Sequence, residues 1–319
     1  MNDFVGKIQE LKKKRNAVIL VHNYQLPEVQ DIADFTGDSL GLSIEASKTK
    51  ADVIVFCGVY FMAETAKILS PQKTVLIPEP SAGCPLADMI SAQQVRDLRV
   101  QHPDAKIICY VNTSADVKAE CDYCCTSANA VEMLQNAFSD QDKIIFLPDK
   151  HLGSYAAHKT GRNVIIWQGY CPSHARILPE HIVALKKEHP AARVMAHPEC
   201  NAAVLKLADA VLSTSGMLRY ARESQAQEFI VATEVGMIYP LKIENPGKRF
   251  YEATSLASCP NMKKTTLAKV ATSLENMVHE VLLPQDTINR AKRSIGNMIR
   301  FRKDAQLTQK EHEETKSLS

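Results

Sequence analysis

The chain has 319 residues, enough for one large domain or for two or three smaller ones with hydrophobic cores of their own. Hydrophobic residues make up 45% and charged residues 23%, which is typical of a globular protein, and 38 Lys and Arg against 36 Asp and Glu leave a formal charge of +2, which implies no polyanionic partner. Because the longest apolar run, residues 53–63, is too short to span a bilayer, we expect a soluble, cytoplasmic protein that binds neither nucleic acid nor a membrane.

Short apolar runs alternate with helical patterns along most of the chain. Runs of four to six apolar residues rich in β-branched side chains predict strands, and amphipathic stretches such as PEVQDIADF and CNAAVLKLADA predict helices between them. In chain order the apolar runs that predict strands lie within residues 17–24, 52–58, 106–112, 143–149, 192–199 and 228–236. Such βα alternation is typical of parallel sheets covered by helices.

The chain contains a threefold repeat. The dipeptide Cys-Pro occurs three times, at intervals of 87 and 88 residues, and three other landmarks recur in the same order at nearly the same offset. They are a polar pair at a strand end, a hydroxyl that opens a helical pattern and a basic residue before the Cys-Pro loop. The pairs are His22 and Tyr24, Tyr110 and Asn112, and His197 and Glu199; the hydroxyls are Ser39, Ser127 and Ser213 with Thr214; the cysteines are Cys84, Cys171 and Cys259.

We therefore predict an α/β fold of three homologous sandwich units with parallel sheets, arranged around a pseudo-threefold axis. The units are expected at residues 1–102, with an N-terminal helix, at 103–189, and at 190–319, with a C-terminal helix from residue 285 and a tail. Open α/β sheets bind ligands at the carboxyl ends of their strands. The polar landmarks and the three cysteines are therefore expected to meet in one central cavity.

Three converging thiolates suit an iron-sulfur cluster or a zinc ion, because thiolates select soft or borderline metals. A closed structural zinc site would need a fourth ligand. The proline after each cysteine fixes the local backbone and suits a loop that delivers a thiolate.

The segment CDYCC, residues 121–125, is the other concentration of thiols. Cys121 and Cys124 have CxxC spacing, but no second pair accompanies them, and their repeat equivalents contain no ligand. They are either functional, as a reversible dithiol or as a substitute metal ligand, or incidental thiols at a helix end. We favour the incidental thiols. Cys57 and Cys109 lie in apolar strands and are expected to be structural.

The assembled pattern, with HNYQLPEVQDIADFTGDS, GCPLADM, YVNTSADVKAE, GYCPSH, MAHPEC, STSGM and SCPNM in order, closely resembles quinolinate synthase from about Val21 to Met262. The resemblance implies an enzyme of NAD biosynthesis that condenses iminoaspartate (iminosuccinate) with dihydroxyacetone phosphate to quinolinate, phosphate and water. It also implies one 4Fe-4S cluster per chain, held by Cys84, Cys171 and Cys259, with the fourth iron open to act as a Lewis acid. An L-aspartate oxidase is the expected supplier of the imine.

The resemblance further implies an active site made of the repeat landmarks, namely His22, Tyr24, Ser39, Tyr110, Asn112, Ser127, His197, Glu199, Ser213 and Thr214. Some members carry a C-terminal CxxCxxC proposed as a redox switch, and this sequence has none after Cys259.

Roles for these residues follow from their chemistry. The hydroxyls at helix starts are expected to bind carboxylate or phosphate groups rather than to serve only as helix caps. Glu199 is the one carboxylate among the strand-end pairs and is expected to be the base, with a raised pKa in a dry cavity. Tyr24 and Tyr110 would donate protons, and His22 and His197 would shuttle protons or bind anionic groups.

Two rival classes remain at this point. An iron-sulfur electron carrier or sensor would recruit a fourth cysteine, for which CDYCC is the supply. A zinc-stabilised interaction module would leave the repeated His, Tyr, Ser and Glu positions unexplained.

Overall fold

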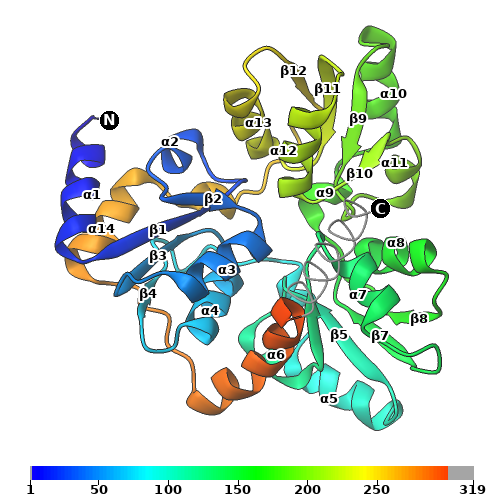
Figure 1. Ribbon diagram of the computed structural model, residues 1–319, viewed down its shortest axis with the longest axis horizontal. Coiled ribbons are helices and arrows are strands. Elements are labelled where there is room, and N and C mark those ends of the chain that lie inside the picture. The colour runs from blue at the N-terminus through cyan, green and yellow to red at the C-terminus, as the bar shows by residue number, and fades with distance from the viewer. Residues whose placement is uncertain (1, 301–319) are drawn as a thin grey trace, which may run out of the picture.

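The computed structural model describes residues 2–300 of the chain. Figure 1 shows three α/β lobes side by side around a common centre, each built around a sheet that comes from one continuous stretch of chain. Each lobe contains one four-stranded sheet in which all strands are parallel. The prediction of three repeated α/β units is therefore confirmed, whereas the exact unit boundaries and the threefold axis stay predictions.

The three sheets have the same strand order, in which the first strand in sequence lies between the second and the third. The first sheet contains β1 (Ala17–His22), β2 (Phe35–Gly37), β3 (Val53–Cys57) and β4 (Thr74–Leu76); the second contains β5 (Lys106–Tyr110), β6 (Tyr123–Cys125), β7 (Ile144–Leu147) and β8 (Val164–Ile166); the third contains β9 (Arg193–Ala196), β10 (Ala210–Val211), β11 (Glu228–Ala232) and β12 (Arg249–Glu252). In each sheet the chain reverses its direction of winding between the first and third strands, which is where open α/β sheets bind ligands.

Helices cover both faces of the sheets. Those of the first lobe are α1 (Asn2–Lys14), α2 (Pro27–Gln30), α3 (Ser39–Lys48) and α4 (Tyr60–Leu69); those around the second sheet are α5 (Ala92–Gln101), α6 (Ala115–Glu120), α7 (Ala130–Asn136) and α8 (Lys150–Thr160). Helix α9 (Pro172–Ala175) follows the second sheet. The third lobe has α10 (Pro179–Glu188), α11 (Ala202–Lys206), α12 (Thr214–Glu223) and α13 (Ile238–Glu244), and α14 (Leu267–Asn276) follows it. Short 3₁₀ turns span Ala87–Met89, Val235–Met237 and Met262–Lys264.

The period of two along each strand divides the core between the two sheet faces. In β1, Ile19 and Val21 pack with α1 and α14 on one face, whereas Val18 and Leu20 belong to the larger core on the other face. Because both faces are buried, the strands are apolar at nearly every position, which explains why they are visible in the sequence as continuous runs.

The chain after the third sheet returns to the first two lobes. Helix α14 packs against α1 of the first lobe, and residues 285–300 are helical and contact the second lobe through Ser294 and Asn297. The predicted terminal helix is therefore present up to residue 300, and its remainder lies outside the described residues. No helix within residues 2–300 has both the length and the apolar content to cross a membrane.

Candidate active site

A cavity of about 270 Å³ lies where the three lobes meet, and all three contribute to its walls. Twelve of the thirteen residues predicted for the site line it: His22, Tyr24, Ser39, Cys84, Tyr110, Asn112, Ser127, Cys171, His197, Glu199, Thr214 and Cys259. Ser213 does not line the cavity. The strand ends and the Cys-Pro loops, far apart in sequence, are thus brought together at the carboxyl edges of the sheets, as predicted.

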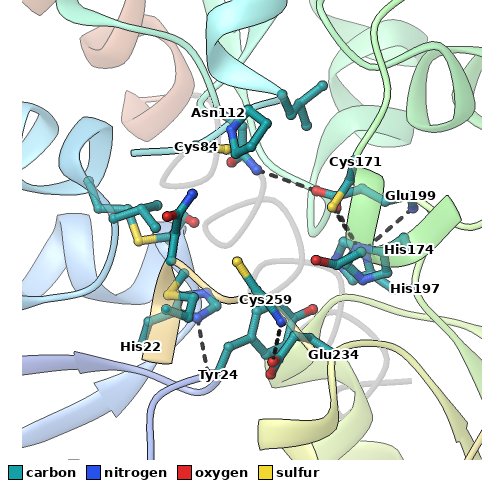
Figure 2. A pocket seen from close by; sticks show the side chains of 18 of the residues that line it. His22, Tyr24, Cys84, Asn112, Cys171, His174, His197, Glu199, Glu234 and Cys259 are labelled. Carbon is teal, nitrogen blue, oxygen red and sulfur yellow. Dashed lines mark hydrogen bonds and ion pairs between the residues drawn. The ribbon is translucent and has the colours of Figure 1, made fainter. Parts of the chain in front are cut away.

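The three Cys-Pro cysteines present their sulfur atoms to the same space from three directions (Figure 2). After each cysteine the chain turns into a short helical segment, so that two backbone amides of the next residues face the sulfur. These amides belong to Leu86 and Ala87 for Cys84, to Ser173 and His174 for Cys171, and to Asn261 and Met262 for Cys259. Burial raises the pKa of each thiol, to about 12 for Cys84, and the amides act in the opposite direction. The loops are therefore shaped to support a sulfur that carries negative charge.

The spacing of the sulfur atoms excludes a single ion held by all three. On one tetrahedral ion with metal–sulfur bonds of about 2.3 Å, two sulfurs lie about 3.8 Å apart. Within the part of the chain that the structure describes, one group of three ligand atoms lies within 4.8 Å of one another, and it is Cys171, His174 and Glu199. The three cysteines are spread more widely around the cavity, as ligands of a larger inorganic group would be.

Glu199 is the centre of a hydrogen-bond network that joins the second and third lobes. Its Oε1 accepts from Tyr110 Oη at 2.7 Å and from Asn112 Nδ2 at 3.4 Å, while Oε2 lies 2.8 Å from Nδ1 of His174. The same His174 Nδ1 is 3.1 Å from Cys171 Sγ, and its Nε2 is 2.9 Å from Thr233 Oγ1. The network therefore connects a cysteine loop to the strand-end side chains.

The expectation of a raised pKa for Glu199 is wrong. Burial alone would raise the pKa, but the adjacent His174, together with His197 and the Tyr110 hydroxyl, lowers it below its ordinary value. The carboxylate is therefore ionised. Burial and the nearby Glu199 raise the pKa of both Tyr24 and Tyr110 well above the usual value, so both phenols stay protonated.

His22 and His197 occupy equivalent places in the first and third lobes and have the same hydrogen-bond pattern. In each ring Nδ1 accepts from the backbone N–H two residues further on, Tyr24 N at 3.2 Å and Glu199 N at 3.4 Å. Burial lowers the pKa of His22 to about 4 and that of His197 to about 3, so both rings are neutral near pH 7. A neutral ring whose Nδ1 accepts carries its proton on Nε2, and that of His197 lies 3.2 Å from Ser127 Oγ.

The predicted hydroxyls stand two residues beyond the second strand of each sheet, but their relation to the helices differs. Ser213 is the N-cap of α12, where its Oγ accepts from Gly216 N, and Thr214 Oγ1 accepts from Asn23 Nδ2 at 2.9 Å. Ser39 is the first residue of α3, which Asp38 caps. The prediction that Ser127 opens a helix is wrong, because α7 begins at Ala130 and Ser127 lies in the preceding turn.

The CDYCC segment lies in the second lobe and does not line the cavity. Cys121 ends α6, and Cys124 and Cys125 lie in β6, so the segment is a helix end followed by a buried edge strand. Cys124 Sγ is 3.4 Å from Cys109 Sγ and also 3.4 Å from Ser294 Oγ. These thiols are packed inside the lobe, as are Cys57 and Cys109 in their strands.

The sequence reasoning missed His174. It lies three residues after Cys171, and its repeat equivalents are Ala87 and Met262, so a search for recurring polar residues passes over it. A histidine on the first helical turn after a ligand cysteine was the available signal. Also missed was Arg176, an exposed side chain that lines the cavity.

The sequence comparisons agree with this site. Residues 6–300 match the family model described as quinolinate synthetase A protein. Similar proteins include quinolinate synthase of Dehalococcoides mccartyi strain CBDB1, 54% identical over 294 residues that cover 92% of this chain and 97% of that protein. Quinolinate synthase 1 of Methanosarcina acetivorans is 52% identical over 297 residues, and quinolinate synthase of Geobacter metallireducens is 50% identical over 298 residues, each covering 93% of this chain and 97% of the relative. The chain therefore belongs to the quinolinate synthase family of enzymes.

Proposed function

We propose that the protein condenses iminoaspartate with dihydroxyacetone phosphate to quinolinate, phosphate and water, as a cytoplasmic step of NAD biosynthesis. One observation carries the proposal most directly. Three cysteines from three lobes surround the same cavity as the Tyr110, Glu199 and His174 network. A metal-binding group and proton-transfer groups are thus placed around one small-molecule site.

Cys84, Cys171 and Cys259 would hold a 4Fe-4S cluster. Their donor chemistry fits, because clusters are normally held by Cys thiolates and each sulfur here is faced by two backbone amides. When bound with three protein ligands, the cluster supplies a Lewis-acidic iron open to a substrate oxygen. The transferase and dehydration chemistry of the enzyme is part of this proposal.

Binding of the anionic substrates is assigned to neutral donors and one cation. His22 and His197 offer Nε2–H groups, and Ser39, Ser127 and Thr214 offer hydroxyls on the cavity wall. Arg176 adds a positive charge near the wall. Ser213 acts beneath this surface as the cap that holds Thr214 in place.

An open acceptor complements these donors. Asn112 Oδ1 is buried on the cavity wall and has no hydrogen-bond partner, whereas Asn112 Nδ2 is used by Glu199. A buried carbonyl oxygen without a partner is unfavourable, and an imine N–H or a hydroxyl of a substrate would satisfy it. This favours a substrate that carries both acidic groups and a hydrogen-bond donor.

Proton transfer is assigned to Glu199, Tyr110, Tyr24 and His22. Glu199 is ionised and is the proton acceptor of the site, and its Oε2 is paired with Nδ1 of His174 at 2.8 Å. The protonated Tyr110 donates to Glu199 and can pass a proton between that carboxylate and a leaving hydroxyl. Tyr24, held at 2.6 Å from Thr233 Oγ1, is a second protonated phenol on the cavity wall.

An electron carrier or sensor would need a fourth protein ligand to close the cluster. Among the described residues, the cysteines that line the cavity are Cys84, Cys171 and Cys259. The buried placement of Cys124 and Cys125 in β6 leaves no route by which CDYCC could supply a ligand without unfolding the second sheet. This favours the enzyme, and we propose an L-aspartate oxidase as the source of the imine.

The proposal is tested by measuring iron, sulfide and quinolinate formation in anaerobically reconstituted variants. Cys259→Ala is expected to lose the cluster and the activity while staying folded, and the matched triple variant with Cys121, Cys124 and Cys125 changed to Ala is expected to keep both. Loss of the cluster in the triple variant alone would move the metal to CDYCC and overturn the assignment.

A further inference from the structure

The group formed by Cys171, His174 and Glu199 has its own capacity to bind metal. The three ligand atoms lie within 4.8 Å of one another. We propose that the protein without its cluster binds a single divalent ion of the zinc class through Cys171 Sγ, His174 Nδ1 and a carboxylate oxygen of Glu199. This state excludes the cluster, because both need Cys171.

The observed distances are close to those that such an ion requires. A tetrahedral ion with bonds of about 2.0 Å to nitrogen and oxygen and about 2.3 Å to sulfur holds N and S about 3.6 Å apart and N and O about 3.3 Å apart. His174 Nδ1 is now 3.1 Å from Cys171 Sγ and 2.8 Å from the Glu199 carboxylate. His174 Nδ1 therefore needs to separate from each of the other two ligand atoms by about 0.5 Å, and Cys171 Sγ and the carboxylate oxygen, which lie within 4.8 Å of each other, need to come within about 3.6 Å.

The surroundings of the group are those of a built metal site. Metal-binding histidines usually place the other ring nitrogen against a polar partner, and His174 Nε2 is 2.9 Å from Thr233 Oγ1. Thr233 is itself held at 2.6 Å by Tyr24 Oη. The second oxygen of Glu199 accepts from Tyr110 Oη, and the backbone amides after Cys171 face its sulfur. Every ligand is thus supported.

The donor set selects the metal. One sulfur, one imidazole nitrogen and one carboxylate oxygen suit the borderline ions Zn²⁺ and Co²⁺, and not Mg²⁺ or Ca²⁺, which prefer oxygen ligands. On binding, the ion displaces the proton of the Cys171 thiol to solvent and takes His174 through Nδ1 of the neutral ring, whose remaining proton then lies on Nε2 beside Thr233 Oγ1. Three protein ligands leave the fourth tetrahedral position facing the cavity, where water or an added anion completes the coordination.

The two metal states share one cysteine but are otherwise separable by mutation. His174 belongs to the single-ion group and not to the three cysteines proposed for the cluster, whereas Cys259 belongs to the cysteines and not to the single-ion group. The ring of His197, whose centroid is 4.9 Å from that of His174, lies in the same cavity but outside the single-ion group. His197→Ala is therefore a matched control for His174→Ala.

The test is a cobalt titration of protein freed of iron by chelation without oxygen. Wild type is expected to bind one Co²⁺ per chain with a thiolate-to-cobalt charge-transfer band and the intense visible bands of tetrahedral cobalt, and Zn²⁺ is expected to remove them. His174→Ala should weaken Co²⁺ binding by about 100-fold or more and still assemble the cluster, and Thr233→Val should weaken it by about 10- to 100-fold. Cys259→Ser and His197→Ala should keep the cobalt spectrum, and Cys259→Ser should lose the cluster.

Two results would overturn the inference. Weak octahedral bands in wild type would show that cobalt binds without Cys171, and loss of the spectrum in Cys259→Ser but not in His174→Ala would move the ion to the three cysteines. Circular dichroism and thermal unfolding show whether each variant is folded, and His174→Gln, which retains a polar side chain, replaces His174→Ala if the latter unfolds. The titration does not depend on quinolinate formation, so a wild type that binds cobalt but never makes quinolinate would refute the proposed function alone.

Discussion

Replacing Glu199 with glutamine separates the proton-transfer role of this residue from its structural role. The side chain is buried, and its two oxygens face Tyr110 and His174. In Glu199→Gln the amide oxygen can keep the hydrogen bond from Tyr110, and the amide nitrogen can donate to His174 Nδ1 once that atom is unprotonated. The shape and both contacts are therefore retained, but the negative charge and the proton acceptor are lost.

The size of each effect follows from this geometry. Exchanging charge-assisted hydrogen bonds for neutral ones costs about 1–2 kcal/mol of unfolding free energy, well below what unfolds a domain. A general base contributes roughly 100- to 10,000-fold to the rate. We therefore expect kcat for quinolinate formation to fall by about that range, with KM changed by less than about fivefold and iron and sulfide contents unchanged.

The assay measures quinolinate by chromatography in anaerobic, reconstituted enzyme, with iron and sulfide determined on the same sample. Glu64→Gln is the matched control, because Glu64 is also a buried glutamate and accepts from Ala115 N at 3.0 Å, but it lies outside the cavity. It should lose stability and keep kcat. The reasoning is refuted if Glu199→Gln retains kcat within tenfold, or if it loses the cluster while Glu64→Gln keeps it.

Two further predictions concern charge. Arg176→Ala should lower kcat/KM by about five- to tenfold at low salt, through a higher KM, and the difference should shrink as salt screens the attraction between Arg176 and the anionic substrates. Lys187→Ala, which removes the same charge from an exposed position of α10, should have no such effect. A loss in Arg176→Ala that does not depend on salt would rule out electrostatic attraction of the substrates as its cause. Lys269 Nζ contacts Glu79 at 2.6 Å, and the hydrogen bonds from Lys269 and Ser81 lower the pKa of Glu79 from 4.5 to about 2. Because the pKa of Glu79 is lowered, the stability that this ion pair contributes is present above pH 4.5 and is lost as the pH falls toward 2. The difference in unfolding free energy between wild type and Glu79→Gln, at most about 1 kcal/mol, should therefore vanish over that pH range. A difference that stays constant with pH would contradict this prediction.

The longer strands could be predicted because burial on both faces leaves a continuous apolar run. The second strand of each sheet could not, since β2, β6 and β10 are only two or three residues long, too short to show an apolar run or an alternating pattern. These short strands are what place Ser39, Ser127 and Ser213 at the cavity side of the fold. The relation of each serine to a helix was therefore predicted less well than its position in the repeat.

The candidate site was predictable where it repeats and hidden where it does not. Cys84, Cys171 and Cys259 lie at equal intervals, so their convergence follows from the fold. His174 has apolar equivalents, and its contact with Glu199 joins residues 25 positions apart across two loops. The ionisation of Glu199 could not be inferred without that contact, because burial alone predicts the opposite direction of the pKa shift.

The differences among the repeats are as informative as their likeness. The cysteines are identical in all three lobes because they face one shared centre, and the helical turn after each of them supplies two amides in the same way. The strand-end pairs have diverged: the first and third lobes present a neutral histidine, whereas the second presents the phenol of Tyr110, which reaches the Glu199 carboxylate of the third lobe. Two neutral histidine donors, a phenol and one ionised carboxylate make the cavity chemically asymmetric within a repeated scaffold. Such a site can orient two dissimilar substrates, which three identical lobes could not do.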